Sequence, residues 1–181
     1  MSDFNTIDDL NVSGKTVLVR ADLNVPMQDG KVSDTTRIDR LAPTLKELAA
    51  KGAKVVILSH FGRPKNGPDA KNSLRHVLAG LSAAVGQDVA FAEDCIGDAA
   101  KTAIAAVPAG GMVLLENTRF HAEEEKNEPG FAKAIAELGD LYVNDAFSAA
   151  HRAHASTEGV AHHLPAAAGR LMQAELDALT K

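Results

Sequence analysis

Cysteine and aromatic residues are scarce in this 181-residue chain, and their scarcity excludes several classes of protein. A single cysteine, Cys95, excludes an internal disulfide and fits a reducing compartment, so we expect a packed thiol in a cytoplasmic protein. The chain has no tryptophan and one tyrosine, which disfavours a platform for stacking nucleic-acid bases. Its net charge of −5 opposes non-specific binding to the phosphate backbone. We therefore expect no nucleic-acid partner.

Long apolar runs and glycine-rich nucleotide motifs are also missing. No run approaches the roughly 20 apolar residues that a membrane-spanning helix needs, and residues 1–9 are polar and acidic, unlike a signal peptide. Neither G-x-x-x-x-G-K-[ST] nor G-x-G-x-x-G occurs. Gly110 and Gly111 precede an apolar run, which is the wrong end of a strand for cradling a phosphate. We expect no membrane contact and no glycine cradle for a nucleotide.

The chain does contain a regular alternation of short apolar runs and amphipathic segments. We predict strands at 16–21, 54–59, 89–92, 112–116 and 141–143, with a last weak strand near 159–161 and an irregular lead-in over 1–13. Predicted helices cover 35–51, 73–85, 97–106, 129–138 and 171–179. This alternation predicts a three-layer α/β/α, Rossmann-like domain with a doubly wound, mainly parallel sheet of about six strands.

Polar residues follow the carboxyl ends of the predicted strands, at the edge where parallel sheets bind ligands. These residues are Asp22, Asn24, His60, Arg63, Arg119 and Arg152, with Arg37 at the entry to the first helix on the same edge. Four arginines at one edge predict an anion site, because guanidinium presents a planar donor fork that matches phosphate and carboxylate oxygens. A site built from arginine side chains suits a small phosphorylated acid.

Ordinary structural roles compete with a binding role at several positions. A single arginine at such an edge is commonly a solvated charge, and we expect Arg20, inside a strand, to be a paired structural residue. We expect residues 123–125 to form a solvated face, and His162 and His163 to have no specific role. Asp145, His151 and His154 lack a further ligand at a persuasive spacing, so we expect no metal.

Short motifs in order along the chain resemble those of the phosphoglycerate kinase family. They are R-A-D-L-N-V-P at 20–26, H-F-G-R-P at 60–64, L-E-N-T-R-F at 115–120, E-E-K-N at 124–127, Y-V-N-D-A-F at 142–147 and H-R-A-H-A-S at 151–156. The resemblance implies reversible phosphoryl transfer between 1,3-bisphosphoglycerate and ADP in glycolysis, giving 3-phosphoglycerate and MgATP. It also implies two Rossmann-like domains with the substrates on facing surfaces.

The resemblance covers only the amino-terminal, phosphoglycerate-binding half of that family. It implies that residues 1–170 form this domain and that residues 171–181 begin the interdomain helix. MgATP or MgADP would then bind to a carboxyl-terminal domain that this chain lacks, so we expect no cofactor or metal here. As a fragment, the chain is expected to bind 3-phosphoglycerate or 1,3-bisphosphoglycerate as a monomer, without catalysing transfer alone.

Individual roles follow from the same resemblance, position by position. It places Asp22 and Asn24 at the substrate's hydroxyl and backbone, His60 at its carboxyl end, and Arg63, Arg119 and Arg152 at its 3-phosphate. Leu23, Phe61 and Gly62 are further expected substrate-binding residues. Arg37 would stabilise charge on the phosphoryl group in flight and is the expected catalytic residue. Ser148 stands where the family usually has glycine, and we expect it to restrict the loop that presents Arg152.

Two other functions compete with the acid-binding half of a kinase. One is a free-standing phosphate-binding module without a catalytic role. The other is a nicotinamide-dependent dehydrogenase domain, which is disfavoured because Asp22–Pro26 occupies the place of the required glycine fingerprint.

Overall fold

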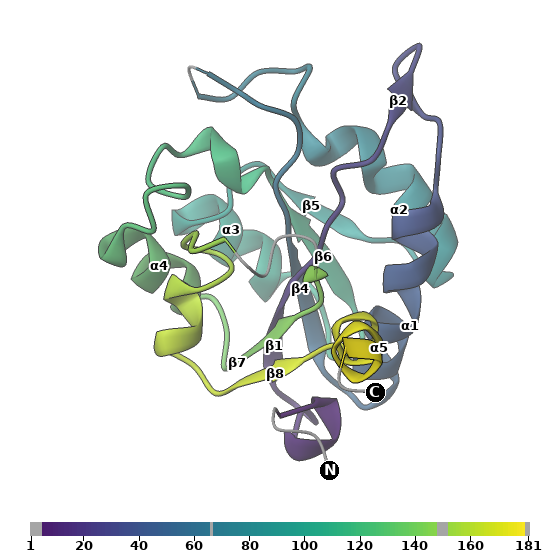
Figure 1. Ribbon diagram of the computed structural model, residues 1–181, viewed down its shortest axis with the longest axis vertical. Helices are drawn as coiled ribbons and strands as arrows, with labels where there is room; N and C mark the ends of the chain where they lie inside the picture. The colour runs from purple at the N-terminus through teal and green to yellow at the C-terminus, as the bar shows by residue number, and fades with distance from the viewer. Residues whose placement is uncertain (1–4, 66, 148–151, 180–181) are drawn as a thin grey trace.

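A six-stranded sheet forms the centre of the computed structural model, which describes residues 5–65, 67–147 and 152–179. The strand order is β5-β6-β4-β1-β7-β8, and every pairing in it is parallel (Figure 1). These strands are β1 (Thr16–Arg20), β4 (Lys54–Leu58), β5 (Ala90–Ala92), β6 (Met112–Leu115), β7 (Leu141–Asn144) and β8 (Ala166–Ala168). A separate antiparallel hairpin pairs β2 (Met27–Gln28) with β3 (Lys31–Val32).

Helices cover both faces of this sheet, which confirms the three-layer prediction. One face carries α1 (Thr36–Ala50), α2 (Leu78–Val85) and α5 (Arg170–Leu179), and the other carries α3 (Gly97–Ala105) and α4 (Pro129–Ala136) (Figure 1). Short 3-10 helices are η1 (Ile7–Asp9), η2 (Leu74–Val77), η3 (Thr118–Phe120) and η5 (Gly159–His162). Within the described ranges, each helix is too short or too polar to span a membrane.

The strand sequences explain the two helical layers, because successive side chains of a strand point to opposite faces. Val17, Val19, Val55 and Ile57 pack into one core with α1 and α2. The residues that alternate with them along the two strands, Leu18, Val56 and Leu58, pack into a second core with α3 and α4. Strands that are apolar at every position therefore need cover on both sides, and only the strand ends remain free to carry polar groups.

Two sequence-based expectations are wrong in their details. Residues 159–162 form η5 rather than a strand, and the sixth strand is β8, which pairs with β7 through Tyr142 and Ala166. A Cβ at Gly159 would lie 2.8 Å from the Ala132 Cβ, so this segment packs against α4. The lead-in is also more ordered than expected, since η1 buries Ile7 completely and Thr6 caps it.

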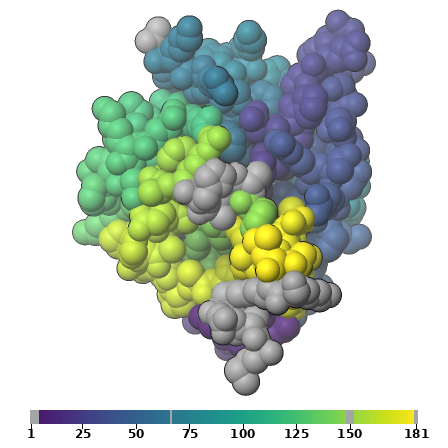
Figure 2. Space-filling model, in the orientation of Figure 1, coloured from purple at the N-terminus to yellow at the C-terminus, as the bar shows by residue number. Residues whose placement is uncertain are grey.

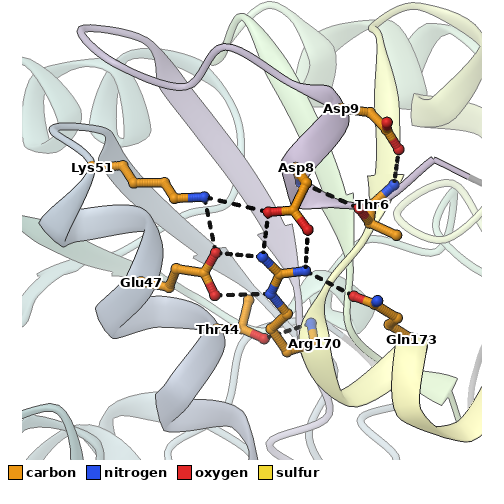
Figure 3. Close-up of polar contacts among 8 residues, drawn as sticks. All are labelled: Thr6, Asp8, Asp9, Thr44, Glu47, Lys51, Arg170 and Gln173. Carbon is orange, nitrogen blue, oxygen red and sulfur yellow. Dashed lines mark hydrogen bonds and ion pairs between the residues drawn. The ribbon is translucent and has the colours of Figure 1, made fainter.

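Arg170 joins α5 to two other elements (Figure 3). Its guanidinium donates to the Glu47 carboxylate of α1 at 2.8 and 2.6 Å and to Asp8 of η1 at 2.8 and 3.1 Å. The Arg170 hydrogen bond is the main cause that lowers the pKa of Glu47 to about 2. The rest of α5 buries only Met172 and lies on the surface (Figure 2), so this charged contact holds the start of the helix.

We expect Glu47→Gln to destabilise the protein by roughly 1–2 kcal/mol at pH 7, since a part-exposed charged hydrogen bond is weakened by solvent screening. Because the folded-state pKa is depressed, this contribution is present above pH 4.5 and is lost as the pH falls toward 2. Urea unfolding at pH 7, 5 and 3.5 should show the difference between variant and wild type shrinking with acid. Glu93→Gln, which alters the exposed Arg75–Glu93 pair, is the control and should change little. A difference independent of pH would contradict the assignment.

Candidate functional site

A groove of about 280 Å³ lies at the carboxyl ends of four adjacent strands, β6, β4, β1 and β7. Its lining consists of Asp22, Asn24, Arg37, His60, Gly62, Arg63, Arg119 and Arg152. The chain segments that rise from this edge, residues 62–65 and 67–72 and the β2–β3 hairpin, stand apart with a hollow between them (Figure 2). All four arginines expected at this edge therefore meet in one groove, together with the expected imidazole.

The turn after β1 is held by its own polar side chains. The Asn24 amide donates to Asp22 Oδ1 at 3.1 Å, and the Gly62 amide donates to Asn24 Oδ1 at 2.9 Å. Arg37 from α1 donates to the Asn24 carbonyl at 2.6 Å and to Asp22 at 3.3 Å. These bonds tie the turns after β1 and β4 together and set one wall of the groove.

Like charges crowd the opposite wall. Arg119 is half-buried, and its Nε makes no hydrogen bond to any described residue. Burial lowers the pKa of Arg119, with Glu125 raising it and the nearby Arg152 and Arg20 lowering it further. The side chains of Arg63 and Arg152 make no hydrogen bond or ion pair with another described residue. An anion would accept hydrogen bonds from the guanidinium donors that lack protein partners, and it would reduce the repulsion between their charges.

His60 is neutral in this groove. It is 7% exposed, and burial followed by the charges of Arg20, Arg119 and Arg152 lowers its pKa to about 3, against the opposing effect of Asp22. Arg20 NH2 lies 2.9 Å from His60 Nδ1. Because a guanidinium can only donate, Nδ1 is the acceptor and the imidazole proton sits on Nε2. His60 thus offers the groove a neutral N–H donor at physiological pH.

The remaining expected site residues lie elsewhere. The side chains of Leu23 and Phe61 pack in the core, where they are 0% and 4% exposed, so neither residue lines the arginine groove. Ser148 and His151 fall outside the described residues. Arg20 is buried and hydrogen-bonded, which confirms its expected structural pairing.

Two buried residues near the site were not identified from the sequence. Asn117 lies two residues past the end of β6 and caps η3. Its side-chain oxygen accepts from the amides of Phe61 and Arg119 at 3.1 and 2.9 Å. Its place just past a strand end was the signal that could have revealed it. Glu124 is fully buried, so the expectation of a solvated face over residues 123–125 is wrong at that position.

A second groove of about 250 Å³ lies beside the first, between α1 and α5. It shares Asp22 and Arg37 with the arginine groove but is otherwise lined by Leu41, Phe147, Leu171 and an Arg40–Glu175 ion pair, with Asp145 at its base. Asp145 accepts from the Met172 amide at 2.9 Å, and burial raises the pKa of this carboxyl. This groove lacks the unpaired cations of its neighbour, so the arginine groove is the candidate site.

Within the described ranges, one group of three side chains could hold a metal ion: Asp94, Cys95 and His121. Asp94 Oδ1 already accepts from the Cys95 amide and pairs with His121 Nε2, both at 2.7 Å. Burial, reinforced by Asp94 and Glu124, raises the pKa of the Cys95 thiol. A protonated thiol beside an occupied carboxylate is a packed hydrogen-bonded cluster, which confirms the expectation that Cys95 is a packed thiol.

A doubly wound parallel sheet with helices on both faces places the chain in the class of Rossmann-like α/β domains, and the arginine groove lies at the carboxyl edge of this sheet. The family model described as phosphoglycerate kinase matches residues 7–181, and the chain belongs to that family. It is 76% identical over 178 residues to phosphoglycerate kinase from Rhodospirillum centenum, covering 98% of this chain and 45% of that protein. Phosphoglycerate kinase from Methylorubrum extorquens is 63% identical over 182 residues, covering 100% of this chain and 46% of that protein.

Solved structures agree with the sequence matches. Phosphoglycerate kinase from Coxiella burnetii aligns with a TM-score of 0.88 at 41% identity, over 98% of this chain and 44% of the other. Phosphoglycerate kinase from Pyrococcus horikoshii aligns with a TM-score of 0.89 at 36% identity, over 97% of this chain and 45% of the other. The chain thus spans about half the length of the relatives that it matches.

Gly62 provides a test of the groove's geometry. Its φ is +62°, and a Cβ there would lie 2.1 Å from Asn72 Oδ1. We expect Gly62→Ala to displace Asn72 and misplace the adjacent Arg63, weakening the binding of inorganic phosphate measured by NMR titration. Gly67→Ala is the matched control, because Gly67 has a φ of +86° with nothing within 4 Å. Both should lose about 1–2 kcal/mol to backbone strain, and equal phosphate binding by the two variants would contradict the assignment.

Proposed function

We propose that this chain is the acid-binding half of a phosphoglycerate kinase, the glycolytic enzyme that transfers a phosphoryl group between 1,3-bisphosphoglycerate and ADP to give 3-phosphoglycerate and ATP. The observation that carries the proposal is the meeting of Arg37, Arg63, Arg119 and Arg152 in one groove at the sheet edge. Family membership supports the reaction, and the unpaired guanidinium donors support the acid's half of it.

The charges of the groove divide the proposed ligand into two ends. Arg63, Arg119 and Arg152 hold the 3-phosphate. The Arg63 and Arg152 guanidinium groups and the Arg119 Nε have no partner among the described residues, and the repulsion among the three charges falls when a dianion binds. His60 donates Nε2–H toward the carboxyl end without itself titrating near neutral pH. Asp22 and Asn24 face the hydroxyl and carbon backbone between the two ends, where a carboxylate accepts from a hydroxyl group.

Arg37 has a different position from the other three arginines. It borders both grooves, is about half exposed, and is held by Asp22 and the Asn24 carbonyl. From there its charge can stabilise the phosphoryl group as it passes between the two substrates. Phosphoryl transfer depends mainly on such positioning and charge neutralisation, and we therefore assign Arg37 the catalytic role.

A magnesium nucleotide does not fit the residues described here. Mg²⁺ prefers oxygen ligands, whereas the single three-residue metal-ligating group in the described ranges includes a thiol and an imidazole. We infer that MgATP or MgADP binds to a second domain and that residues 1–170 form the acid-binding domain. Residues 171–181 would then begin the helix that connects the two. We further propose a cytoplasmic monomer, in keeping with one buried thiol.

The isolated chain should bind 3-phosphoglycerate with an affinity that falls as salt increases. Titration followed by NMR should move the amides near Asn24, Arg63, Arg119 and Arg152. Arg119→Ala should weaken binding by about 10- to 150-fold, since a charged hydrogen bond contributes roughly 1.5–3 kcal/mol. Arg75→Ala removes an exposed arginine that pairs with Glu93 outside the groove and should bind as wild type does. Unmoved groove amides at millimolar ligand would contradict the site.

The isolated chain should not catalyse phosphoryl transfer. The missing alignment of nucleotide and acid is worth up to about 7–11 kcal/mol of barrier, so a coupled assay with MgATP and 3-phosphoglycerate should read background. Joining the chain to the carboxyl-terminal half of the Rhodospirillum centenum relative should restore turnover. A folded chimaera without turnover would favour a free-standing binding module instead. Turnover by the isolated chain, in a preparation free of host enzyme, would contradict the proposal that acid and nucleotide bind to separate domains.

A further inference from the structure

A buried line of four polar residues runs from the loop before α4 to the arginine groove. Its members are Glu124, Ser156, Arg20 and His60, and we refer to them as the Glu124–His60 network. The first three are fully buried and His60 is 7% exposed. Buried charges are costly unless they are paired and hydrogen-bonded, so the contacts along this line require an explanation.

Each contact joins elements that are far apart in the sequence. Glu124 Oε1 accepts from the Ser156 amide at 2.7 Å, and its other oxygen accepts from the Ser156 hydroxyl. Arg20 on β1 donates from Nε to Ser156 Oγ at 2.7 Å and from NH2 to His60 Nδ1 at 2.9 Å. The network thus links the sheet interior with the turn after β4.

The proton on each bond can point only one way. A carboxylate only accepts, so the single hydroxyl proton of Ser156 goes to Glu124. The Ser156 oxygen is then free to accept from Arg20, and a guanidinium can only donate. His60 Nδ1, at the end of the line, must accept, which places the imidazole proton on Nε2.

Charge balance also makes Arg20 depend on Glu124. Arg20 has no carboxylate within 4.0 Å among the described residues, although it is fully buried. The buried anion nearest to it in the hydrogen-bonded line is Glu124, separated from it by one hydroxyl group. Without that anion, Arg20 would join Arg119 and Arg152 as an uncompensated cation beside His60.

We propose that Glu124 is a positioning residue that acts through Ser156 and Arg20 to hold His60 as the Nε2–H tautomer at the arginine groove. The opposite tautomer would turn a lone pair toward an anion and repel it. Only the identity of the ligand, the carboxyl end of 3-phosphoglycerate, rests on the proposed function. The tautomer itself is a property of the protein without ligand.

Glu124 also anchors the segment that carries Arg152, and the test must separate this effect. The Ala155 amide donates to the Glu124 carbonyl at 2.9 Å, and Thr157 Oγ1 donates to the Arg152 carbonyl at 2.6 Å. A loosened segment would weaken phosphate binding without altering the His60 tautomer. The nitrogen chemical shifts of His60 therefore discriminate between positioning and simple structural support.

The experiment uses chain labelled with ¹⁵N-histidine and long-range ¹H–¹⁵N correlation between pH 5 and 8. The wild type should show an unprotonated Nδ1 and a protonated Nε2 at His60 throughout this range. Glu124→Gln should shift His60 toward a mixture of tautomers and weaken 3-phosphoglycerate binding by about tenfold, the value of one charge-assisted hydrogen bond. Glu125→Gln, which removes a charge from the exposed neighbouring position, should leave the tautomer unchanged.

Ser156→Ala is the second variant and decides the outcome if Glu124→Gln does not fold. It removes the acceptor that holds Arg20 Nε without removing a charge. Arg20 NH2 is then no longer fixed against His60 Nδ1, and the tautomers should also mix. A wild-type His60 protonated on Nδ1, or a folded variant of either kind that keeps the pure Nε2–H tautomer, would overturn the proposal. A tautomer that depends on Glu124 in a protein that does not bind 3-phosphoglycerate would uphold the network and contradict the proposed function.

Discussion

The repulsion among guanidinium groups at the carboxyl edge of the sheet is the interaction on which the site depends. Arg20, Arg119 and Arg152 all lie close enough to His60 that their charges lower its pKa. Such an arrangement persists only where the scaffold is rigid and where some of the charge is balanced from within the protein. The apolar strands supply the rigidity, because both faces of the sheet are buried. Glu124 supplies balancing charge to Arg20, and the groove arginines are left for a ligand.

The same constraint explains the different roles of chemically identical side chains. Arg170 is fully engaged with Glu47 and Asp8 and serves to hold α5 (Figure 3). Arg20 is engaged with Ser156 and His60 and serves to orient the imidazole. Arg119, by contrast, keeps a buried Nε without a partner among the described residues. An arginine whose donors are already paired within the protein has a structural role, whereas one with unpaired donors is available to a ligand.

Much of this arrangement could be predicted from the sequence, because it follows from local patterns. Unbroken apolar runs such as Val55–Leu58 predict strands covered on both faces, and parallel topology then brings Asp22, His60 and Arg119 to one edge. The convergence of the arginines therefore required no coordinates. Family motifs added their expected roles, which remain proposals.

The failures of prediction have a common physical cause, since they depend on contacts between distant segments. Glu124 stands between two other glutamates, and nothing local distinguishes the buried one from its solvated neighbours. Only the approach of Ser156, 32 residues away, makes its burial possible. The alanine-rich β8 is likewise a strand because β7 pairs with it, not because alanine favours strands. Composition and periodicity do not contain this information.

We propose that the arginine groove, rather than its neighbour beside α5, receives a phosphorylated acid. The decisive measurement is a crystal structure of this chain with 3-phosphoglycerate. We expect the phosphate within hydrogen-bonding distance of Arg63, Arg119 and Arg152, with the carboxylate near His60 Nε2. An ordered ligand seated instead against Arg40 and Leu171, or phosphate and carboxylate in exchanged positions, would contradict it.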